Sequence, residues 1–428
     1  MAETRRSLEL GSRLTMGIWR FAILVALVLS AKTFAAAPEP LLAPGHAVKW
    51  WFVFKFNAAK FGGCSGGATR SCPFGGTVQD YVYGQQFVYA SDESEAQDGA
   101  NVLQEGSGCV GSVRDPVGAT VDPIYHGQYH YVVWNDQFYD DPEIAGCSKN
   151  CASPWGHSKG TLAWDDEGNG VVLQVTTPSW LGAGSANHPR QHDGNSLGCV
   201  IDDNVKVSQH FFALKLTKDD VVNVLKALQR ASVVTDIADP QIVSNGGPAD
   251  IQSLVRQLGR KSSSQEIFPA DLSFGVRLIG KPSALHVPPW QLVSSQLGGM
   301  ALRTATWWAP PRIPTTTGNA GIKCWSTSLP AAGPVQIATS GKWAGVEFGL
   351  KGGPTADNNH AKIGVSLNES KGVAIFGDLN QQGALSGSRC DSSQNGRGGL
   401  FFVLPSTKLA NAIGELIGGA TAPSASAR

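Results

Sequence analysis

The chain has 428 residues, of which 42% are hydrophobic, so it can bury a substantial core and form two domains or one duplicated domain. Its 34 basic and 34 acidic residues give a formal net charge of zero. This balance excludes a globally positive field that would attract nucleic acid to the whole surface, so binding of a polyanion must depend on a local site.

The N-terminal segment has the pattern of a secretory signal peptide. Arginines precede an apolar run from Phe21 to Leu29, and three alanines, Ala35 to Ala37, follow it. The apolar run is shorter than the ~20 residues that span a bilayer, which argues against a membrane anchor. We therefore expect secretion or export to the periplasm, and residues 1–37 are excluded from the fold.

Strand patterns dominate the rest of the chain. Short β-branched or aromatic runs bounded by Gly, Asp and Asn predict strands at 50–56, 81–89, 129–134, 170–176, 210–216, 372–376 and 400–404. The clearest helix is 217–231, because Thr217 and Asp220 can form a capping pair and apolar residues fall on one face. A second helix is predicted from Pro248 to before Gly259.

Two stretches of the chain resemble each other. They read GHSKGTLAWDDEGNGVVLQV from Gly156 with HFFALKLTKDDVVNVLKAL from His210, and NHAKIGVSLNESKGVAIFGD from Asn359 with GLFFVLPSTKLANAIGELI from Gly399. In both, a His-x-Lys triplet opens a strand, a polar turn and an apolar strand follow, and an aromatic strand later leads into a helix. Four features in the same order favour duplication over chance similarity.

The duplication predicts an α/β fold, a mixed-sheet sandwich of two pseudo-twofold halves that share one cleft. The first half would span residues 38–231 and the second half 307–418, joined by a connecting segment at 232–306. The Ser- and Ala-rich tail, 419–428, is expected to be disordered.

The two His-x-Lys triplets are the candidate reactive groups. Side chains alternate along a strand, so His157 and Lys159 project from one face, as do His360 and Lys362. Two lysines could stabilise the negative charge of a phosphoryl transition state without a metal. One histidine could attack phosphorus while the other protonates the leaving oxygen, which favours mildly acidic to neutral pH for groups with an ordinary pKa of ~6.5. The pattern predicts phosphodiester chemistry.

Three further residues are candidate phosphate ligands. Asn380 follows the returning strand of the second unit, and Ser179 has a roughly corresponding place in the first. Arg397 lies among glycines that would let a ligand approach the backbone. For Asn380, a role in stabilising a turn is an equal alternative.

The eight cysteines of an exported chain predict disulfide bonds. They are Cys64, Cys72, Cys109, Cys147, Cys151, Cys199, Cys324 and Cys390. Cys64 with Cys72 and Cys147 with Cys151 are close enough to pair, and Cys147-x-x-x-Cys151 lacks the second pair that a zinc site needs. His126 and His130 have the spacing of a helical metal pair, but the neighbouring tyrosines favour a strand. We expect no metal and no cofactor.

At this point the residues resemble those of the deoxyribonuclease II family, acid endonucleases of the phospholipase D superfamily. The resemblance rests on WWFVFKFN from Trp50, WNDQ from Trp134, GHSKG from Gly156, LGCV from Leu197, NHAKIGVS from Asn359, GDLNQQ from Gly377 and RGGL from Arg397. It covers most of the chain from Trp50 to Leu404, with divergent stretches near 57–80, 180–195 and 232–300. The chain is similar to an exported, microbial-type member.

The resemblance implies metal-independent endonucleolysis of DNA at acid pH, leaving 3′-phosphate and 5′-hydroxyl ends. It implies His157, Lys159, His360 and Lys362 as the catalytic set, with Asn380 as the phosphate-binding amide. Two departures are evident: Val175 stands where animal members have a further histidine, and the cysteine pattern near the second motif differs. A Cys324–Cys390 disulfide is a suggestion from the same comparison.

Two other functions remain as alternatives. A phosphodiesterase acting on lipid headgroups would use the same two-histidine chemistry, but the chain has no evident interfacial amphipathic helix. A secreted binding protein could keep the fold without catalysis, although both His-x-Lys motifs are intact. The nucleophilic histidine, the preference for DNA over RNA and the oligomeric state stay open.

Overall fold

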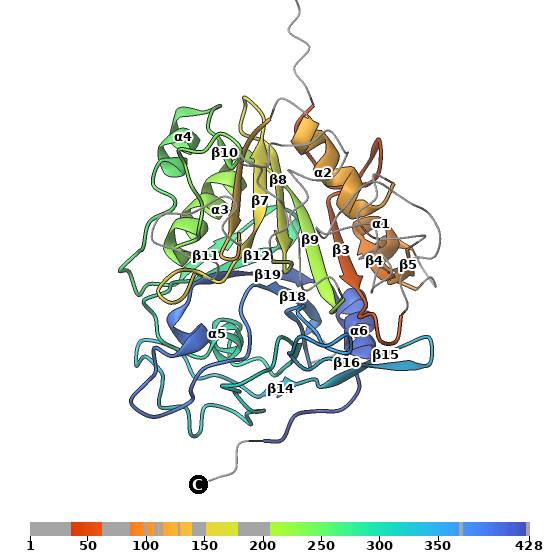
Figure 1. Ribbon diagram of the computed structural model, residues 1–428, viewed down its shortest axis with the longest axis vertical. Helices are drawn as coiled ribbons and strands as arrows, with labels where there is room; N and C mark the ends of the chain where they lie inside the picture. The colour runs from red at the N-terminus through yellow and green to blue at the C-terminus, as the bar shows by residue number, and fades with distance from the viewer. Residues whose placement is uncertain are drawn as a thin grey trace, which may run out of the picture. The chain divides into compact units, whose positions relative to one another are not determined.

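The computed structural model of the chain describes residues 36–61, 86–97, 101–106, 110, 114–126, 129–138, 151–178, 206–367 and 371–424. Within these ranges the strands form one sheet of eight strands, one of seven, and two small two-stranded sheets (Figure 1). The small sheets pair β1 (Leu41–Ala43) with β2 (His46–Ala47) and β15 (Ser340–Trp343) with β16 (Val346–Gly349).

The eight-stranded sheet has the order β10-β6-β7-β8-β9-β3-β4-β5, and all its neighbours are antiparallel. Its strands are β3 (Trp50–Lys55), β4 (Phe87–Ser91), β5 (Gln104–Glu105), β6 (His130–Asn135), β7 (Lys159–Trp164), β8 (Gly170–Val175), β9 (Gln209–Leu216) and β10 (Val243–Ser244). The helices of this part are α1 (Asp92–Ala96), α2 (Pro116–His126), α3 (Lys218–Ala231) and α4 (Ala249–Val255).

The seven-stranded sheet has the order β11-β12-β19-β18-β17-β13-β14, and it is mixed because β14 runs parallel to β13. Its strands are β11 (Phe268–Asp271), β12 (Arg277–Lys281), β13 (Leu302–Ala305), β14 (Val335–Ile337), β17 (Ile363–Ser366), β18 (Val373–Gly377) and β19 (Gly399–Pro405). Helices α5 (Pro289–Gln296) and α6 (Thr407–Leu416) belong to this part, with short 3-10 turns at Ser273–Gly275 and Ser393–Gly396.

The duplication is present in the topology. Five adjacent strands follow the order β6-β7-β8-β9-β3 in the first sheet and β13-β17-β18-β19-β12 in the second. In chain order, a strand of each set and a helix (β3 and α2, or β12 and α5) precede the other four strands of that set, and a helix (α3 or α6) follows the last of them. The mixed α/β fold therefore consists of two related halves.

The second half begins earlier than the sequence indicates. The segment 232–306, predicted to connect the halves, contributes β10 to the first sheet and β11, β12 and β13 to the second, and it also forms helices α4 and α5. The predicted disordered tail is also partly wrong: the Ala422 amide donates to the Ile337 carbonyl at 2.8 Å, and the Arg303 guanidinium binds the Gly419 carbonyl at 2.7 Å. Backbone hydrogen bonds to β14 and to Thr315 hold the described part of this segment, residues 419–424.

Helix α3 forms as predicted. The Thr217 hydroxyl and the Asp220 carboxylate make a reciprocal capping box, and Val221, Val224 and Leu228 are buried on one face. This face contacts β8 and β9 of the first sheet and β12 and β19 of the second, so α3 packs against both halves. The strand expected around His126 and His130 is different, because His126 ends α2 and β6 begins only at His130.

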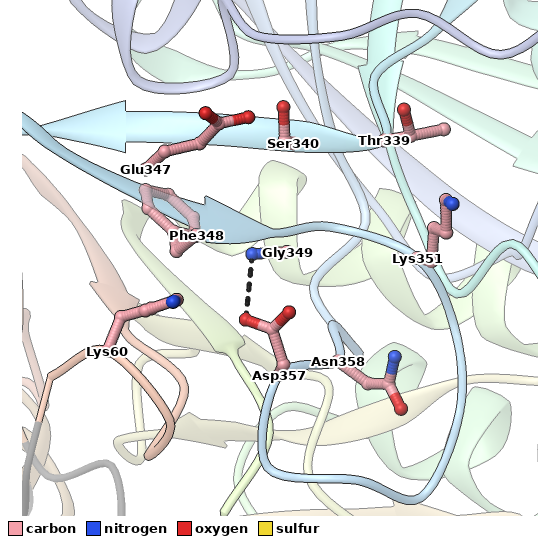
Figure 2. Close-up of a pocket in the computed structure, with 9 residues that line it drawn as sticks. All are labelled: Lys60, Thr339, Ser340, Glu347, Phe348, Gly349, Lys351, Asp357 and Asn358. Atoms are coloured by element: carbon pink, nitrogen blue, oxygen red, sulfur yellow. Dashed lines mark hydrogen bonds between the residues drawn. The ribbon is translucent and has the colours of Figure 1, made fainter.

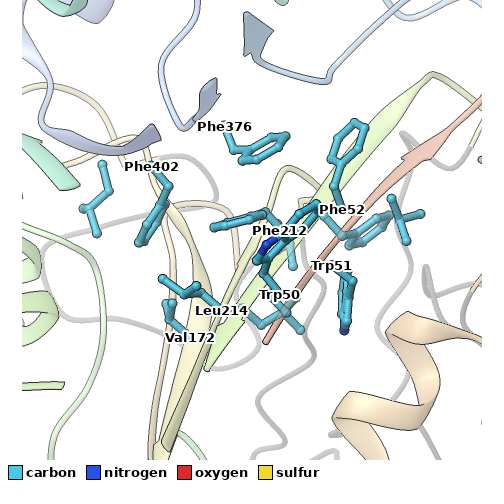
Figure 3. Close-up of a cluster of buried hydrophobic side chains, with 14 of the residues drawn as sticks. Trp50, Trp51, Phe52, Val172, Phe212, Leu214, Phe376 and Phe402 are labelled. Carbon is cyan, nitrogen blue, oxygen red and sulfur yellow. The ribbon is translucent and has the colours of Figure 1, made fainter. Parts of the chain in front are cut away.

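Aromatic side chains from both sheets pack in the core (Figure 3). The ring centroids of Phe212 on β9 and Phe376 on β18 are 4.4 Å apart, and those of Phe52 and Phe376 are 4.8 Å apart. Phe402 on β19 lies 5.6 Å from Phe212. Each buried phenylalanine contributes about 1.5 to 3 kcal/mol relative to an exposed one, so the two halves are held together strongly.

The Cys324–Cys390 disulfide is present, with the two Cα atoms 5.1 Å apart. The predicted pairs Cys64–Cys72 and Cys147–Cys151 lie wholly or partly outside the described residues, as does the signal peptide up to residue 35. In the part of the chain that the structure describes, no helix combines the length and apolar character needed to cross a membrane.

Candidate active site

Both His-x-Lys motifs lie at the start of equivalent strands. Lys159 is the first residue of β7, and Lys362 directly precedes β17. All four side chains are buried: His157 and His360 are 6% and 5% exposed, and Lys159 and Lys362 are 2% and 1% exposed. A buried imidazole beside a buried ammonium is costly unless other groups compensate, so their partners are informative.

Each motif is attached to the opposite half of the fold. The His157 amide donates to the Gly398 carbonyl at 2.8 Å, and the His360 amide donates to the Ser208 carbonyl at 2.7 Å. Gly398 and Ser208 have the same topological position, directly before β19 and β9. These reciprocal hydrogen bonds bring the two predicted motifs to one site.

Hydrogen bonds to the opposite half of the fold also orient the imidazole rings. His157 Nδ1 lies 2.8 Å from the Asp378 carbonyl oxygen, which can only accept, so Nδ1 carries the proton in the neutral ring. His360 Nδ1 lies 3.2 Å from Gln209 Oε1, an oxygen that also accepts from the Thr176 hydroxyl at 2.7 Å. In both rings this tautomer leaves the lone pair on Nε2, the nitrogen available for nucleophilic attack.

The two lysines differ in their partners. Lys159 Nζ forms a buried ion pair with Asp136 Oδ1 at 2.6 Å, and Arg397 Nη2 contacts Asp136 Oδ2 at 2.8 Å. Burial raises the pKa of Asp136, but Lys159, His157 and Arg397 outweigh it and hold the pKa below its ordinary value. Lys362 Nζ instead donates to the His360 carbonyl at 2.5 Å, and no carboxylate among the described residues pairs with it.

Strand register identifies the counterpart of Asp136. Asp136 lies two residues after Trp134, which pairs with Gly160, the residue after Lys159. Trp307 lies two residues after Ala305, which pairs with Ile363, the residue after Lys362. The Trp307 ring meets the His360 ring edge to face at 5.0 Å. The second motif therefore has an aromatic ring where the first has a carboxylate.

The electrostatics couple the two motifs. Burial, followed by the nearby lysines, holds the pKa of both His157 and His360 well below the ordinary value, although Asp136 opposes this at His157. Burial and then Lys159 lower the pKa of Lys362 in the same way. Because the charges of each motif act on the other, the four groups form one site.

A second layer of polar residues supports this site. His210 Nδ1 accepts the Lys362 amide at 3.1 Å, and His210 Nε2 lies 3.5 Å from Gln174 Oε1. Gln174 Nε2 donates to Asp378 Oδ1 at 3.0 Å, and burial raises the pKa of Asp378 to about 7. The sequence did not predict roles for these residues or for Asp136 and Gln209. Asp136 and Asp378 could have been singled out from the sequence, because they lie in WNDQ and GDLNQQ, two of the segments that carry the family resemblance.

The other predicted ligands are placed as follows. Arg397 donates to the carbonyls of Trp155 at 3.0 Å and Gly156 at 2.6 Å as well as to Asp136, so it links the halves beside His157. Asn380 is 4% exposed; its Nδ2 donates to Gln382 Oε1, while its Oδ1 finds no hydrogen-bond partner among the described residues. Ser179 lies outside the described residues. Contact of these residues with phosphate stays a prediction.

A pocket of about 330 Å³ lies beside the segment that precedes His360 (Figure 2). It is lined by Lys60, Thr339, Ser340, Glu347, Phe348, Gly349, Lys351, Asp357 and Asn358. Its two lysines are matched by two carboxylates, one of which, Asp357, accepts from the Gly349 amide at 3.1 Å. The described ranges contain no cluster of three or more His, Cys, Asp or Glu side chains suited to a metal ion.

Comparisons with known proteins bear on the first half. Residues 41–245 match the family model described as Deoxyribonuclease II, which supports the family resemblance and includes His157 and Lys159. No curated protein matches the chain. A crystal structure of a mutant of yeast tyrosyl-DNA phosphodiesterase 1 covers 68% of this chain and 86% of its own, with 10% identity and a TM-score of 0.31.

Proposed function

We propose that the chain is a deoxyribonuclease II-like phosphodiesterase that hydrolyses DNA endonucleolytically, with His157, Lys159, His360 and Lys362 as its reacting set. The observation that carries this proposal is the reciprocal attachment of the two motifs, which leaves both Nε2 atoms as the reactive nitrogens of a single lysine-containing site. The match of residues 41–245 to the Deoxyribonuclease II family model supports DNA as the substrate.

In the first step, Nε2 of one histidine attacks phosphorus and the bond from phosphorus to the 5′-oxygen breaks. The other histidine gives its Nε2 proton to that oxygen, so a 5′-hydroxyl leaves and the 3′-phosphoryl group stays on the first ring as a phosphohistidine. Lys159 and Lys362 stabilise the negative charge that develops on the phosphoryl oxygens. Asn380, Ser179 and Arg397 are the further candidates for phosphate contact.

In the second step, the histidine that gave up its proton takes one from water. The water oxygen attacks phosphorus, the bond from phosphorus to nitrogen breaks, and a 3′-phosphate is released. The first ring is then neutral again and the second is protonated, so the cycle closes.

An acidic pH preference is part of the proposal. The general acid must carry a proton, but burial and the lysines hold the pKa of both imidazoles below its ordinary value. A more acidic medium, together with the negative charge of the bound phosphodiester, would protonate one of them. From the pattern of residues 1–37, we also propose that the enzyme is secreted or periplasmic.

The test is cleavage of plasmid DNA in excess EDTA from pH 4 to 8 by the wild type, His157→Ala and His360→Ala, with the exposed His46→Ala as the control. We expect the wild type and the control to cut, and both active-site variants to lose activity by about 10²- to 10⁴-fold or more. The 3′ ends should be blocked to a polymerase until a phosphatase treats them. Absence of cutting at every pH would overturn the function, and a requirement for added metal would overturn the mechanism.

A further inference from the structure

Two buried lysines outside the His-x-Lys motifs have equivalent places in the two halves. Lys55 ends β3 and pairs with Gln209 on β9, while Lys281 ends β12 and pairs with Gly399 on β19. Both are 0% exposed. A buried ammonium group is unfavourable unless acceptors bind its protons. A lysine at both equivalent positions therefore directs attention to the groups that accept from it.

Both lysines donate to carbonyl oxygens of equivalent residues. Lys55 Nζ binds the Val207 carbonyl at 2.6 Å, and Lys281 Nζ binds the Arg397 carbonyl at 2.8 Å. Val207 and Arg397 each lie two residues before the partner of the lysine on the neighbouring strand. Lys281 Nζ also donates to the Asn395 carbonyl at 2.9 Å and the Leu285 carbonyl at 2.7 Å.

The next peptide along the chain holds a reactive histidine. Ser208 follows Val207, and its carbonyl accepts the His360 amide at 2.7 Å. Gly398 follows Arg397, and its carbonyl accepts the His157 amide at 2.8 Å. Each lysine is therefore one peptide removed from the hydrogen bond that attaches the histidine of the opposite motif.

We infer that Lys55 and Lys281 are positioning residues for the proposed reaction, Lys55 for His360 and Lys281 for His157. The ammonium fixes the carbonyl before the attachment peptide and thereby fixes the backbone of the histidine. A displacement of about 1 Å in a reacting group can cost about 10²-fold in rate, so a site built across two halves needs such fixation. This inference rests on the proposed two-histidine function and adds residues that never touch the substrate.

The test uses two substrates that differ in their leaving group. DNA releases an alkoxide that needs a general acid, whereas thymidine 3′-(4-nitrophenyl phosphate) releases a nitrophenolate that does not. Of His157→Ala and His360→Ala, the variant without the nucleophile should lose both activities. The variant without the acid should lose DNA cleavage and keep a rapid burst of about one equivalent of nitrophenolate, because only the later hydrolysis of the phosphohistidine needs this histidine as base. These two profiles are the reference.

We expect Lys281→Met to follow the profile of His157→Ala and Lys55→Met to follow that of His360→Ala, each with a loss of about 10²-fold in the rates that its reference variant loses, the rate of DNA cleavage and, for the nucleophile, the rate of the nitrophenolate burst. Lys226→Met, which changes an exposed lysine of α3, is the matched control and should leave both activities unchanged. If the Met variants do not fold, Lys55→Gln and Lys281→Gln, which keep N–H donors, replace them and should show the same two profiles with smaller losses.

Equal losses of DNA cleavage and of the nitrophenolate burst in both lysine variants would mean a general packing role and would overturn the inference. It would also be overturned if Lys281→Met followed the profile of His360→Ala and Lys55→Met that of His157→Ala. If the wild type cleaves neither substrate, the proposed function fails and the inference fails with it. If the wild type cleaves both substrates, the proposed function stands, and the profiles of the lysine variants then test the positioning role alone.

Discussion

The two His-x-Lys motifs share their backbone geometry and differ in their charges. His157 and His360 are attached through equivalent amide hydrogen bonds, yet Lys159 has the carboxylate of Asp136 while Lys362 has none among the described residues. The aromatic Trp307 occupies the place of Asp136 in the second half. Duplication has kept the positions of the two His-x-Lys motifs, and the residues behind them differ.

This difference in charge partners indicates that the two lysines have different roles. The Lys159–Asp136–Arg397 cluster is a buried, compensated set that connects the first half to the segment before β19. Lys362, close to His360, has no ion-pair partner among the described residues; burial and Lys159 lower its pKa, and the more distant Asp136 and Asp378 oppose this only in part. The first lysine should therefore matter most for stability and the second for chemistry.

The largest expected effect on stability is that of Asp136→Asn. It would leave Lys159 and Arg397 buried without a counter-charge, and removing one partner of such a cluster costs about 3 to 5 kcal/mol in the free energy of unfolding. Urea denaturation measures the loss. Asp166→Asn, which breaks the exposed pair with His130, is the control and should cost much less. Similar losses in the two variants would contradict the proposed difference in roles.

The next effect concerns Lys362→Met. Removing this cation should lower the rate of DNA cleavage by about 10²-fold, because it withdraws a charge that stabilises the transition state. It should also raise the pKa of His360, since Lys362 lowers it. The rate and an NMR titration of ¹³C-labelled histidine measure the two changes.

Lys371→Met, which changes an exposed lysine shortly before β18, is the control for this prediction. The stability loss of Lys362→Met should be smaller than that of Asp136→Asn. A pKa of His360 that does not move would show that the lysine acts elsewhere.

A smaller effect is expected for His210→Leu, which gives β9 the residue that β19 has at the equivalent place, Leu400. The Lys362 amide would lose its acceptor, a cost of about 1 to 3 kcal/mol at pH 7. Burial holds the pKa of His210 well below its ordinary value, so the wild type loses stability as pH falls below about 6.5, where the unfolded imidazole binds a proton. The difference in unfolding free energy between variant and wild type should therefore narrow from pH 7 to pH 5, and a widening would contradict this assignment.

The sequence predicted the elements with strong local patterns. Helix α3 and the strands after each His-x-Lys motif were recognisable because capping, periodicity and turn residues are encoded within a few positions. Helix α2 contains Pro123, and β12 has only five residues with Gly280 inside, so neither has a strong pattern. Both were missed, and because β12 was missed, the start of the second half was placed too late in the chain.

The structure brings the two predicted His-x-Lys motifs together, and it surrounds them with residues that the sequence did not indicate. The two motifs repeat in the sequence, which made His157 and His360 recognisable. Asp136 and Arg397 are hydrogen-bonded although 261 residues separate them in sequence, and 151 residues separate Gln209 from His360. No local sequence pattern indicates such contacts. The structure therefore adds the residues that orient the histidines rather than the histidines themselves.

The smallest effect distinguishes the equivalent residues Thr176 and Asp378, whose side chains accept the amides of His210 at 3.0 Å and Leu400 at 2.7 Å. Burial raises the pKa of Asp378 to about 7, so the folded chain keeps a proton that the unfolded carboxyl loses near pH ~4. The stability from this proton is complete below the unfolded pKa and is lost as pH rises through about 7. Asp378→Asn cannot titrate, so it should cost less than about 1 kcal/mol at pH 5 and gain on the wild type by pH 8. In urea unfolding, Thr176→Val should differ from the wild type by the same free energy of unfolding at pH 5 and at pH 8. If the difference for Asp378→Asn is also independent of pH, the Asp378 carboxyl is ionised throughout this range and the assignment is wrong.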